Sequence, residues 1–436
     1  MEQFWSIIYN FLFLPLFFIT AKLVSAFNPK IKQSLKARRG LFKHLESKLK
    51  SLEPDKKNIL IHCASLGEFE QAKPIIDRLD SSGKYNFIIS FFSPSGFNHS
   101  KLDTALNSKI IKTYLPFDSI PNERKFIKLV NPAVVIFIKY DLWFNLLRYT
   151  NHKKIFSIVV NKSYEGKRFK WRFPISRSYK KTVLNLVDFI GVTDEEDKIE
   201  FQKLLNRKDN IDVFGDTKYE RIAKAKAVQS ANEILSSSLI KDKNIFVVGS
   251  SWNKDEELVL QVIEKISSNG ISEQLSIITI IAPHEPSEEV LDDIEYEIRT
   301  NYPHLKSIRY SEIAKFKDEN IILIDCVGIL MGLYKYAKVA YVGGGFRNGM
   351  HNVLEPAGYG IPVLFGNDNI SEEGRHLLQK GGGIAISDSK DLYKNLVTLF
   401  KKPEERDKVG KRSLSVFDSS NEASKRISDL INKMIN

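Results

Sequence analysis

The sequence predicts an α/β protein with two Rossmann-like domains that face a cleft, preceded by an N-terminal membrane-anchor helix. Three observations support this prediction. The chain of 436 residues is 43% hydrophobic, which is enough for two ordinary cores. From residue 57 onward, short apolar runs alternate with amphipathic segments, as repeated βαβ units require. The alternation is interrupted near residues 211–225 and then starts again. The chain also begins with an almost continuous apolar run.

The opening apolar run extends over residues 4–21. A bilayer-spanning helix needs about 20 residues, so the run is just long enough. Its polar or helix-bending interruptions are Ser6, Asn10, Pro15 and Thr20. The only charge before it is Glu2, unlike the basic leader of a secretory signal. We therefore expect a membrane anchor in residues 1–27. A cleaved signal or a core helix remains an alternative, and the run does not decide between a spanning and an interfacial helix.

A cluster of basic residues follows the apolar run. Its members are Lys30, Lys32, Lys36, Arg38, Arg39, Lys43, Lys48 and Lys50. Because positive charge flanks membrane segments on the cytoplasmic side, the rest of the chain is expected in the cytoplasm. The same cluster also suits contact with anionic lipid headgroups.

The first domain is expected over residues 28–222. Its predicted strands are Asn58–His62, Phe87–Phe92, Ile110–Leu115, Ala133–Ile138, Ile155–Val160 and Phe189–Val192. Their nearly continuous Val, Ile and Phe content is typical of parallel strands buried on both faces.

The second domain is expected over residues 223–436. After a surface helix over Ile222–Leu239, its predicted strands are Ile245–Gly249, Leu275–Ala282, Ile321–Asp325, Val339–Val342, Pro362–Phe365 and Ile384–Ile386. A terminal helix within Ser413–Ile435 is expected to pack back across the junction between the domains. Ligands of such open sheets bind outside the carboxyl ends of the strands, which places the expected site there.

The composition and net charge indicate which classes of molecule the protein is suited to bind. The formal net charge is +12, which favours an anionic partner such as a membrane surface, a phosphorylated substrate or nucleic acid. Cys63 and Cys326 both lie in apolar runs and are interpreted as buried hydrophobic residues. No cysteine and histidine cluster has zinc-site spacing, so no metal site is expected. A segment of mixed basic and aromatic residues at 166–181 is a further candidate for binding lipid phosphates or nucleic acid.

The segment IHCASLGEFEQAKPII at 61–76 contains the first candidate catalytic residue. A strand ends at His62, small residues form a tight turn, and Glu68 stands where a helix begins. A carboxylate at this edge can take a proton from an attacking hydroxyl group. A helix N-terminus, however, holds a carboxylate pKa low, whereas a strong base needs a raised pKa. A first-turn Glu that only caps its helix is the alternative.

The segment VGGGFRNGMHNVLEPAGYGIPVLFG at 342–366 predicts a ligand loop. Three glycines, Gly343 to Gly345, follow a strand and precede a helix expected to start near Asn352. Glycines allow backbone amides to approach a ligand, and Glu355 is placed to bind a ribose. Two further loops, at 281–288 and 325–330, leave neighbouring strands at the same expected edge.

These motifs together resemble the 3-deoxy-D-manno-octulosonic acid (Kdo) transferase family of lipid A biosynthesis. The matching segments are ASLGE at 64–68, YLPFD at 114–118, DLWFNL at 141–146, TDEED at 193–197, GDTKYE at 215–220, APHEP at 282–286, DCVGIL at 325–330 and GMHNVLEPAGYGIPVLFG at 349–366. The resemblance extends over nearly the whole chain. It implies a GT-B type glycosyltransferase at the cytoplasmic side of a bacterial inner membrane.

The resemblance also implies a reaction and its residues. Kdo would pass from CMP-Kdo, with inversion, to the tetraacylated disaccharide bisphosphate precursor of lipid A. Glu68 falls on the family's catalytic base, and Lys218 on a lysine that stabilises the transition state. The expected CMP contacts are Pro283, His284, Val327, Gly328, Ile329, Asn352, Val353, Leu354 and Glu355. Besides membrane lipids, no other partner is implied, and neither a cofactor nor nucleic acid is expected.

The sequence departs from the family pattern at three places. The usual Glu-x-Glu before LW is Lys139-Tyr140-Asp141. A lysine thus replaces the first carboxylate, which the family uses to stabilise the transition state, so the resemblance gives only weak support for this role in Lys139. His284 begins a stretch that differs from the usual Arg-His-Pro-Glu, and Ile329 replaces the usual Glu after Gly328. Two alternatives therefore remain, a GT-B transferase with another nucleotide sugar and a lipid acceptor, or a non-catalytic membrane-bound nucleotide or lipid binder.

Overall fold

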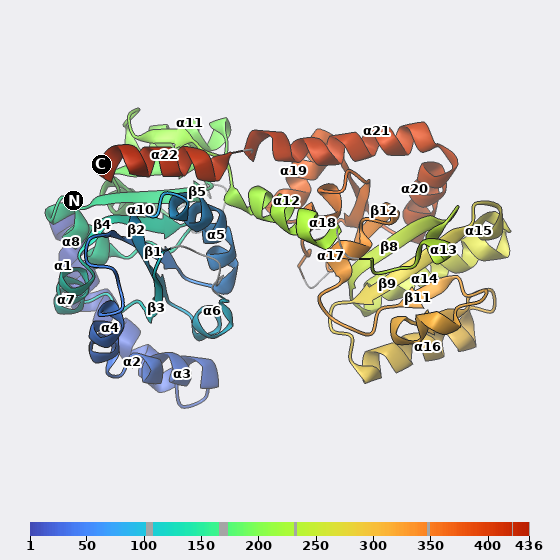
Figure 1. Cartoon of the computed structure of the whole chain (residues 1–436), viewed down its shortest axis with the longest axis horizontal. Coiled ribbons are helices and arrows are strands. Elements are labelled where there is room, and N and C mark those ends of the chain that lie inside the picture. The colour runs from blue at the N-terminus through green and yellow to red at the C-terminus, as the bar shows by residue number, and fades with distance from the viewer. Residues whose placement is uncertain (102–107, 165–172, 231–232, 347–348, 421, 436) are drawn as a thin grey trace. The chain divides into compact units, whose positions relative to one another are not determined.

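The chain folds into two compact units, each built on a parallel β-sheet (Figure 1). The computed structural model describes residues 1–101, 108–164, 173–230, 233–346, 349–420 and 422–435. The first unit comprises residues 1–221 and 419–436, and the second comprises residues 222–418. The predicted α/β class, with two Rossmann-like domains and an apolar N-terminal helix, is confirmed.

The first unit contains a seven-stranded sheet in the order β3-β2-β1-β4-β5-β6-β7. The strands are β1 (Lys57–Cys63), β2 (Tyr85–Phe91), β3 (Ile110–Tyr114), β4 (Pro132–Ile138), β5 (Phe156–Lys162), β6 (Phe189–Val192) and β7 (Ile211–Val213). All neighbouring pairs are parallel. The strand order reverses between β1 and β4. Such a switch point opens a crevice at the carboxyl edge of a sheet, where ligands bind.

Helices cover both faces of this sheet and enclose two apolar cores. They are α5 (Leu66–Asp80), α6 (Pro94–His99), α7 (Ile120–Val130), α8 (Phe144–His152), α10 (Pro174–Asn185) and α11 (Glu195–Leu205). Helix α12 (Thr217–Ser230) begins in the first unit, and its residues from Ile222 onward belong to the second. The C-terminal helix α22 (Ala423–Ile435) returns to the first unit and packs against α5. Its apolar residues Ile427, Ile431 and Ile435 are part of one of these cores.

The N-terminal apolar segment forms one continuous helical stretch. It runs through α1 (Glu2–Ile8), the π-helical segment η1 (Tyr9–Phe13) and α2 (Leu14–Val24), and is followed by α3 (Pro29–Ala37) and α4 (Leu41–Leu49). Over Glu2–Val24 its length and mean hydropathy of 1.9 are sufficient to cross a membrane. The polar residues that interrupt the run have structural partners, which the sequence did not predict.

One side of this helix docks on the first unit. Asn10 and Asn145 exchange two side-chain hydrogen bonds, at 3.1 and 2.8 Å. The Tyr9 hydroxyl donates to Asp118 at 2.8 Å, and Trp5 is buried. The large apolar side chains that remain exposed are Phe4, Ile7, Phe11, Leu12, Phe13, Leu16, Ile19, Leu23 and Val24. The helix therefore presents one polar and aromatic side to the protein and an apolar side outward.

The second unit contains a seven-stranded parallel sheet in the order β10-β11-β9-β8-β12-β13-β14. The strands are β8 (Asn244–Ser251), β9 (Ile277–Pro283), β10 (Ser307–Arg309), β11 (Ile321–Leu323), β12 (Ala337–Val342), β13 (Val363–Gly366) and β14 (Gly383–Ile386). Its switch point lies between β8 and β12. The helices are α13 (Ser237–Ile240), α14 (Asn253–Ser268), α15 (Ile271–Gln274), α16 (Glu288–Asn301), α17 (Leu330–Leu333), α18 (Leu354–Ala357), α19 (Glu372–Lys380), α20 (Ser389–Lys401) and α21 (Pro403–Leu414), with 3-10 turns η2 (Tyr310–Lys315) and η3 (Ser415–Ser420).

Two local predictions are wrong, and one strand was not predicted. The surface helix expected over 222–239 instead begins at Thr217 and ends at Ser230. Cys326 is exposed, because β11 ends at Leu323 and the cysteine stands in the loop that follows. Strand β10 was not predicted, since its three residues Ser307–Arg309 include only one apolar side chain. Residues 166–172 of the basic and aromatic segment lie outside the described residues.

Candidate functional site

Glu68 lies at the switch point of the first sheet, in the first turn of the helix that follows β1. The hydroxyl of Ser65 caps this helix and accepts a hydrogen bond from the Glu68 amide at 3.4 Å. The Glu68 carboxylate turns back over the loop and accepts a hydrogen bond from the Ala64 amide at 2.5 Å. This is close to a capping box, so the carboxylate is held in place by its own backbone.

The acidity of Glu68 resolves the conflict that the sequence left open. The pKa of Glu68 is raised to about 7, chiefly by burial and to a smaller extent by the negative charge of Asp141. The Ala64 amide and the positive charges of His62 and Lys139 act in the opposite direction. Burial outweighs these stabilising groups, so the carboxyl group titrates near neutral pH, where a general base works best.

A buried hydrogen-bond network supports this edge. His62 is fully buried at the end of β1, and its two ring nitrogens lie 3.0 Å from Ser90 Oγ and 3.0 Å from Asp141 Oδ2. The same carboxylate oxygen accepts from Trp143 Nε1 at 3.0 Å. The sequence reasoning missed His62, although a histidine inside an otherwise apolar strand was a visible signal. The network ties the ends of β1, β2 and β4 together beside Glu68.

Lys139 directly follows β4, on the other side of the switch point. It adopts a left-handed backbone conformation with φ of 68°, and its amide donates to the Val160 carbonyl at 3.0 Å. Its ammonium lies 5.2 Å from the centre of the Tyr140 ring, and the Lys162 ammonium lies 4.7 Å from the same ring. Asp141, the retained carboxylate of the altered motif, binds His62 instead. The first carboxylate of the family pattern is thus replaced here by a cationic side chain.

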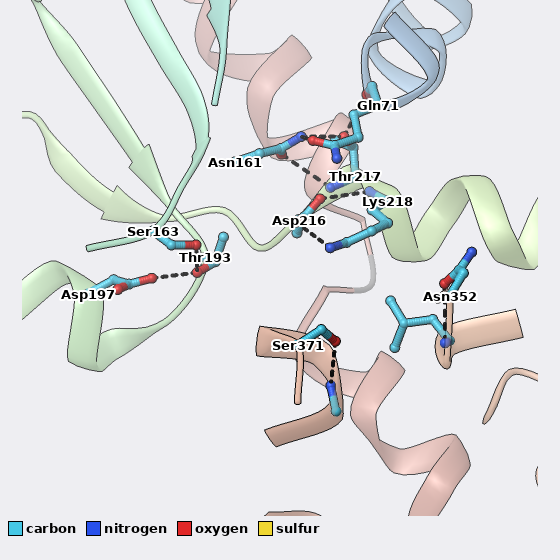
Figure 2. A network of polar contacts seen from close by, with 12 residues as sticks. Gln71, Asn161, Ser163, Thr193, Asp197, Asp216, Thr217, Lys218, Asn352 and Ser371 are labelled. Atoms are coloured by element: carbon cyan, nitrogen blue, oxygen red, sulfur yellow. Dashed lines mark hydrogen bonds and ion pairs between the residues drawn. The ribbon is translucent and has the colours of Figure 1, made fainter. Parts of the chain in front are cut away.

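Lys218 belongs to the same unit and is held at the start of α12 (Figure 2). Its amide donates to Asp216 Oδ1 at 2.9 Å, its ammonium lies 3.7 Å from Asp216 Oδ2, and only 15% of its side chain is exposed. The preceding Thr217 hydroxyl accepts from Asn161 at 2.7 Å and donates to the Gln71 carbonyl at 2.6 Å. Because Gln71 is on α5, one turn beyond Glu68, these bonds fix Lys218 relative to the helix that carries Glu68 (Figure 2).

In the second unit, the glycine loop after β12 is tightly packed. A Cβ on Gly343 would approach the Ser250 carbonyl oxygen to 2.4 Å, and one on Gly345 would approach the Gly366 carbonyl oxygen to 2.5 Å. The Gly344 amide donates to the buried carboxylate of Asp255 at 2.9 Å. Packing alone therefore explains these glycines. The backbone amides of Gly343 and Gly344, which were expected to approach a ligand, donate hydrogen bonds within the protein instead.

Three aromatic rings gather at the carboxyl edge of the second sheet. Trp252 follows β8, His284 follows β9, and His351 follows the glycine loop. The ring centroids of His284 and His351 are 4.2 Å apart, and those of Trp252 and His284 are 4.8 Å apart, with nearly parallel planes. Trp252 Nε1 donates to His351 Nε2 at 2.9 Å. Burial lowers the pKa of His351, and the neighbouring His284 lowers it further, so this ring is neutral at pH 7. We call these residues the aromatic shelf.

The other predicted donor contacts lie around this edge. Val327 is 80% exposed, and Gly328 has a φ of 94° that favours glycine. Pro283 ends β9 next to His284, and Ile329 precedes α17. The Asn352 side chain accepts from the Leu354 amide at 3.2 Å and donates to Glu355 at 3.0 Å. The side chains of Val353 and Leu354 are fully buried, so a ligand contact from these two runs through the backbone.

Within the described ranges, no group of three or more His, Cys, Asp and Glu side chains is placed to hold an ion.

Sequence comparison identifies relatives over most of the chain. Residues 33–221 match the family described as 3-Deoxy-D-manno-octulosonic-acid transferase (kdotransferase). A 3-deoxy-D-manno-octulosonic acid transferase of Haemophilus influenzae is 24% identical over 442 residues, which cover 98% of this chain and 98% of that protein. A bifunctional glycosyltransferase/methyltransferase of Fusobacterium nucleatum is 25% identical over 86% of this chain, and the match spans only 57% of that protein's length.

Solved structures share the fold at low sequence identity. A glycosyltransferase of Rickettsia africae superposes with a TM-score of 0.54 and 12% identity, covering 88% of this chain and 99% of that one. A UDP-N-acetylglucosamine 2-epimerase of Listeria monocytogenes superposes with a TM-score of 0.58 and 13% identity, covering 85% and 95%. These likenesses establish a GT-B-like fold and nothing about the substrate. The first unit thus matches the Kdo transferase family model, and along its whole length the chain is similar to a 3-deoxy-D-manno-octulosonic acid transferase.

Proposed function

We propose that this protein transfers Kdo from CMP-Kdo to the tetraacyl disaccharide 4'-bisphosphate precursor of lipid A, with inversion at the anomeric carbon. The observation that carries the proposal is Glu68, a carboxylate with a pKa of about 7 at the switch point of the first sheet. A general base of this acidity is partly ionised at neutral pH and accepts a proton without a metal ion.

The reaction assigns one step to Glu68. Its carboxylate removes the proton of an acceptor hydroxyl as that oxygen bonds to the anomeric carbon of Kdo. The bond from this carbon to the CMP phosphate breaks, and CMP leaves with the electron pair. The new bond forms on the face opposite the leaving group, which inverts the configuration. The proton remains on Glu68 until solvent removes it.

Two lysines are proposed to stabilise charge that develops during transfer. Lys218 is oriented by Asp216 and by the bonds that hold Thr217. Lys139 is near enough to lower the pKa of Glu68. A positive charge that is already oriented before the reaction stabilises a departing phosphate or the Kdo carboxylate at little reorganisation cost.

The second unit is proposed to bind the donor. The aromatic shelf of Trp252, His284 and His351 offers flat rings on which a cytosine base can stack. Asn352 and Glu355, which already bond to each other, provide polar groups for the ribose. Pro283, Val327, Gly328 and Ile329 complete the proposed contacts of the nucleotide.

The N-terminal helix is proposed to hold the enzyme at the cytoplasmic face of the inner membrane. Its outward side exposes large apolar side chains from Phe4 to Val24, with charged residues only near the two ends, at Glu2 and Lys22, and a lipid acceptor is available only at a membrane. Because its inner side is bonded to the protein through Tyr9 and Asn10, the helix positions the first unit close to the bilayer.

Incubation of detergent-solubilised protein with CMP-Kdo and the tetraacyl disaccharide bisphosphate, followed by mass analysis of the lipid, tests the proposal. The expected product carries one or more added Kdo units. CMP-Kdo binding without any mass gain would indicate a different acceptor. Failure to bind CMP-Kdo would indicate that the changes at Lys139, His284 and Ile329 accompany a different nucleotide sugar.

A further inference from the structure

A cavity of about 350 Å³ lies in the first unit, beside the basic segment that follows the apolar helix. Its volume falls within the range of about 300–1,000 Å³ typical of small-ligand sites. It is lined by Gln33, Lys36, Ala37, Leu41, His44, Leu45, Lys48, Phe97, Asn98, Thr113 and Tyr114. The lining thus contains two lysines and a histidine but no carboxylate. We call this cavity the α3–α4 pocket.

The spacing of the lining residues shows that one face of each helix is directed into the pocket. On α4 they stand at positions 41, 44, 45 and 48, and on α3 at 33, 36 and 37, which is one helical face in each case. The opposite wall consists of Phe97 and Tyr114, whose rings stack with centroids 4.3 Å apart. The pocket therefore has apolar walls with cationic side chains among them.

Lys48, which lines the pocket, and Lys112, a residue of β3 outside its lining, bond to uncharged groups in the described part of the chain. The Lys48 ammonium donates to the Lys112 carbonyl at 2.8 Å, and the Lys112 ammonium donates to the carbonyls of Phe97 and Ser100. Among the described residues no carboxylate pairs with either ammonium. Burial lowers the pKa of both lysines, and the Lys48 charge lowers that of Lys112 further. A bound anion relieves the repulsion between such like charges.

The wall of the pocket also contacts the loop of the proposed base. Helix α6 supplies Phe97 and Asn98 to the pocket. On its other side, the Ser93 amide donates to the Ala64 carbonyl at 3.0 Å. A Cβ on Gly96 would come within 3.1 Å of the Ser65 backbone. One short helix thus separates the pocket from the loop on which Glu68 stands.

Arg38, at the C-terminus of α3, lies outside the lining of the pocket. This guanidinium is buried, and it donates to the Leu115 carbonyl at 2.8 Å and to the Phe92 carbonyl at 2.9 Å. It also lies 4.7 Å from the centre of the Phe117 ring. Arg38 therefore anchors α3 to the residues that follow β2 and β3, and its burial keeps it from contacting a lipid headgroup.

We propose that the α3–α4 pocket binds the phosphate-bearing, acylated end of the acceptor lipid. Lys36 and Lys48 contact a phosphate group, and the apolar wall formed by Leu41, Leu45 and Phe97 receives part of an acyl chain. The pocket follows directly after the apolar helix, so an occupant reaches it from the membrane side. This inference rests on the proposed function for the identity of the lipid, but the pocket's preference for a phosphorylated lipid is testable without the donor.

The test compares Lys36→Gln/Lys48→Gln with Lys43→Gln. Lys43 is an exposed lysine on the opposite face of α4, so the control loses charge on the same helix without touching the pocket. Binding of the tetraacyl disaccharide bisphosphate in detergent is measured without donor, beside the same lipid lacking one phosphate. The double variant is expected to bind the bisphosphate about tenfold or more weakly, the loss typical of one charge-assisted hydrogen bond. It is also expected to lose the preference for the second phosphate, with an unchanged melting temperature.

Transfer kinetics separate this inference from the proposed function. In the double variant the KM for the acceptor is expected to rise, while kcat and the affinity for CMP-Kdo stay unchanged. If the wild type transfers Kdo and the double variant has the same KM for the acceptor, the pocket assignment is wrong and the proposed function stands. If lipid binding depends on the two lysines but the wild type transfers no Kdo, the pocket assignment stands and the proposed function is wrong. Reduced adhesion to anionic phospholipid vesicles with unchanged acceptor binding would also overturn it, because the lysines would then contact membrane headgroups.

Discussion

The two units share an architecture and differ in what stands at their switch points. In the first unit the edge between β1 and β4 carries titratable groups, with Glu68, His62 and Asp141 close together. In the second, the edge between β8 and β12 carries closely packed glycines and the aromatic shelf of Trp252, His284 and His351. One edge is suited to moving a proton, and the other to holding a flat, charge-neutral ring. The comparison indicates that the same fold supports chemistry or binding according to the loops after equivalent strands.

Glu68→Gln should have the largest effect, because it removes the proton acceptor and leaves the shape of the loop. The expected loss in kcat for Kdo transfer is about 10²- to 10⁴-fold. Glu70→Gln is the matched control, since Glu70 is on the same helix and pairs with Lys73 at 2.6 Å. Near wild-type turnover in Glu68→Gln would show that Glu68 is not the general base.

Trp252→Ala tests the second edge. Loss of a stacking ring is worth about 1–3 kcal/mol per base, so the affinity for CMP should fall by roughly 5- to 150-fold. Trp252→Phe keeps a ring but loses the hydrogen bond to His351, and should retain most of the affinity. Equal CMP affinity in wild type and Trp252→Ala, measured by calorimetry, would contradict the role of the aromatic shelf.

The pH profile of kcat/KM should report the Glu68 carboxyl group. Because the base must be ionised, activity should rise with pH, with a midpoint near the pKa of about 7, and then level off. Lys139→Met removes a positive charge that lowers this pKa, so its midpoint should move to higher pH. A midpoint that stays in place or moves to lower pH would show that Lys139 does not act on Glu68.

The smallest expected effect concerns Glu123, a carboxyl group of the first unit that lies in the core. Both of its oxygens lack a hydrogen-bond partner among the described residues. Burial raises its folded pKa above 4.5, with a further contribution from Asp118. Its contribution to stability is therefore full below pH 4.5 and is lost as pH rises through the folded pKa. Glu123→Met should lose less stability from pH 5 to 8, and should be about 1–3 kcal/mol more stable than wild type at pH 8 by denaturant unfolding. If the stability of both proteins changes with pH in the same way, burial of Glu123 does not contribute to the pH dependence.

The sequence predicted the sheets better than the site. Buried parallel strands are continuous apolar runs, so the predicted strand Phe189–Val192 coincides with β6 and Ile110–Leu115 nearly coincides with β3. Glu68 was also predicted at the start of a helix, which the structure confirms. The pattern could not show that Asn10 is bonded to Asn145, because the two residues are far apart in the chain.

The raised pKa of Glu68 and the aromatic shelf could not be predicted from the sequence, for a related reason. A pKa depends on burial and on charges brought together by folding, and local sequence gave only the opposing effect of the helix N-terminus. Trp252, His284 and His351 are separated by many residues, and only the parallel sheet brings their rings into contact. Single residues were visible in advance, whereas their combinations were not.

The division of roles between the two edges is tested most directly by measuring CMP binding and Kdo transfer on the same preparations of Glu68→Gln and Trp252→Ala. The account predicts that Glu68→Gln binds CMP like wild type but transfers almost no Kdo. It also predicts that Trp252→Ala binds CMP weakly but transfers Kdo at nearly the wild-type rate when the donor is saturating. Loss of CMP binding in Glu68→Gln, or loss of transfer by Trp252→Ala at saturating donor, would contradict the separation of chemistry and nucleotide binding between the two units.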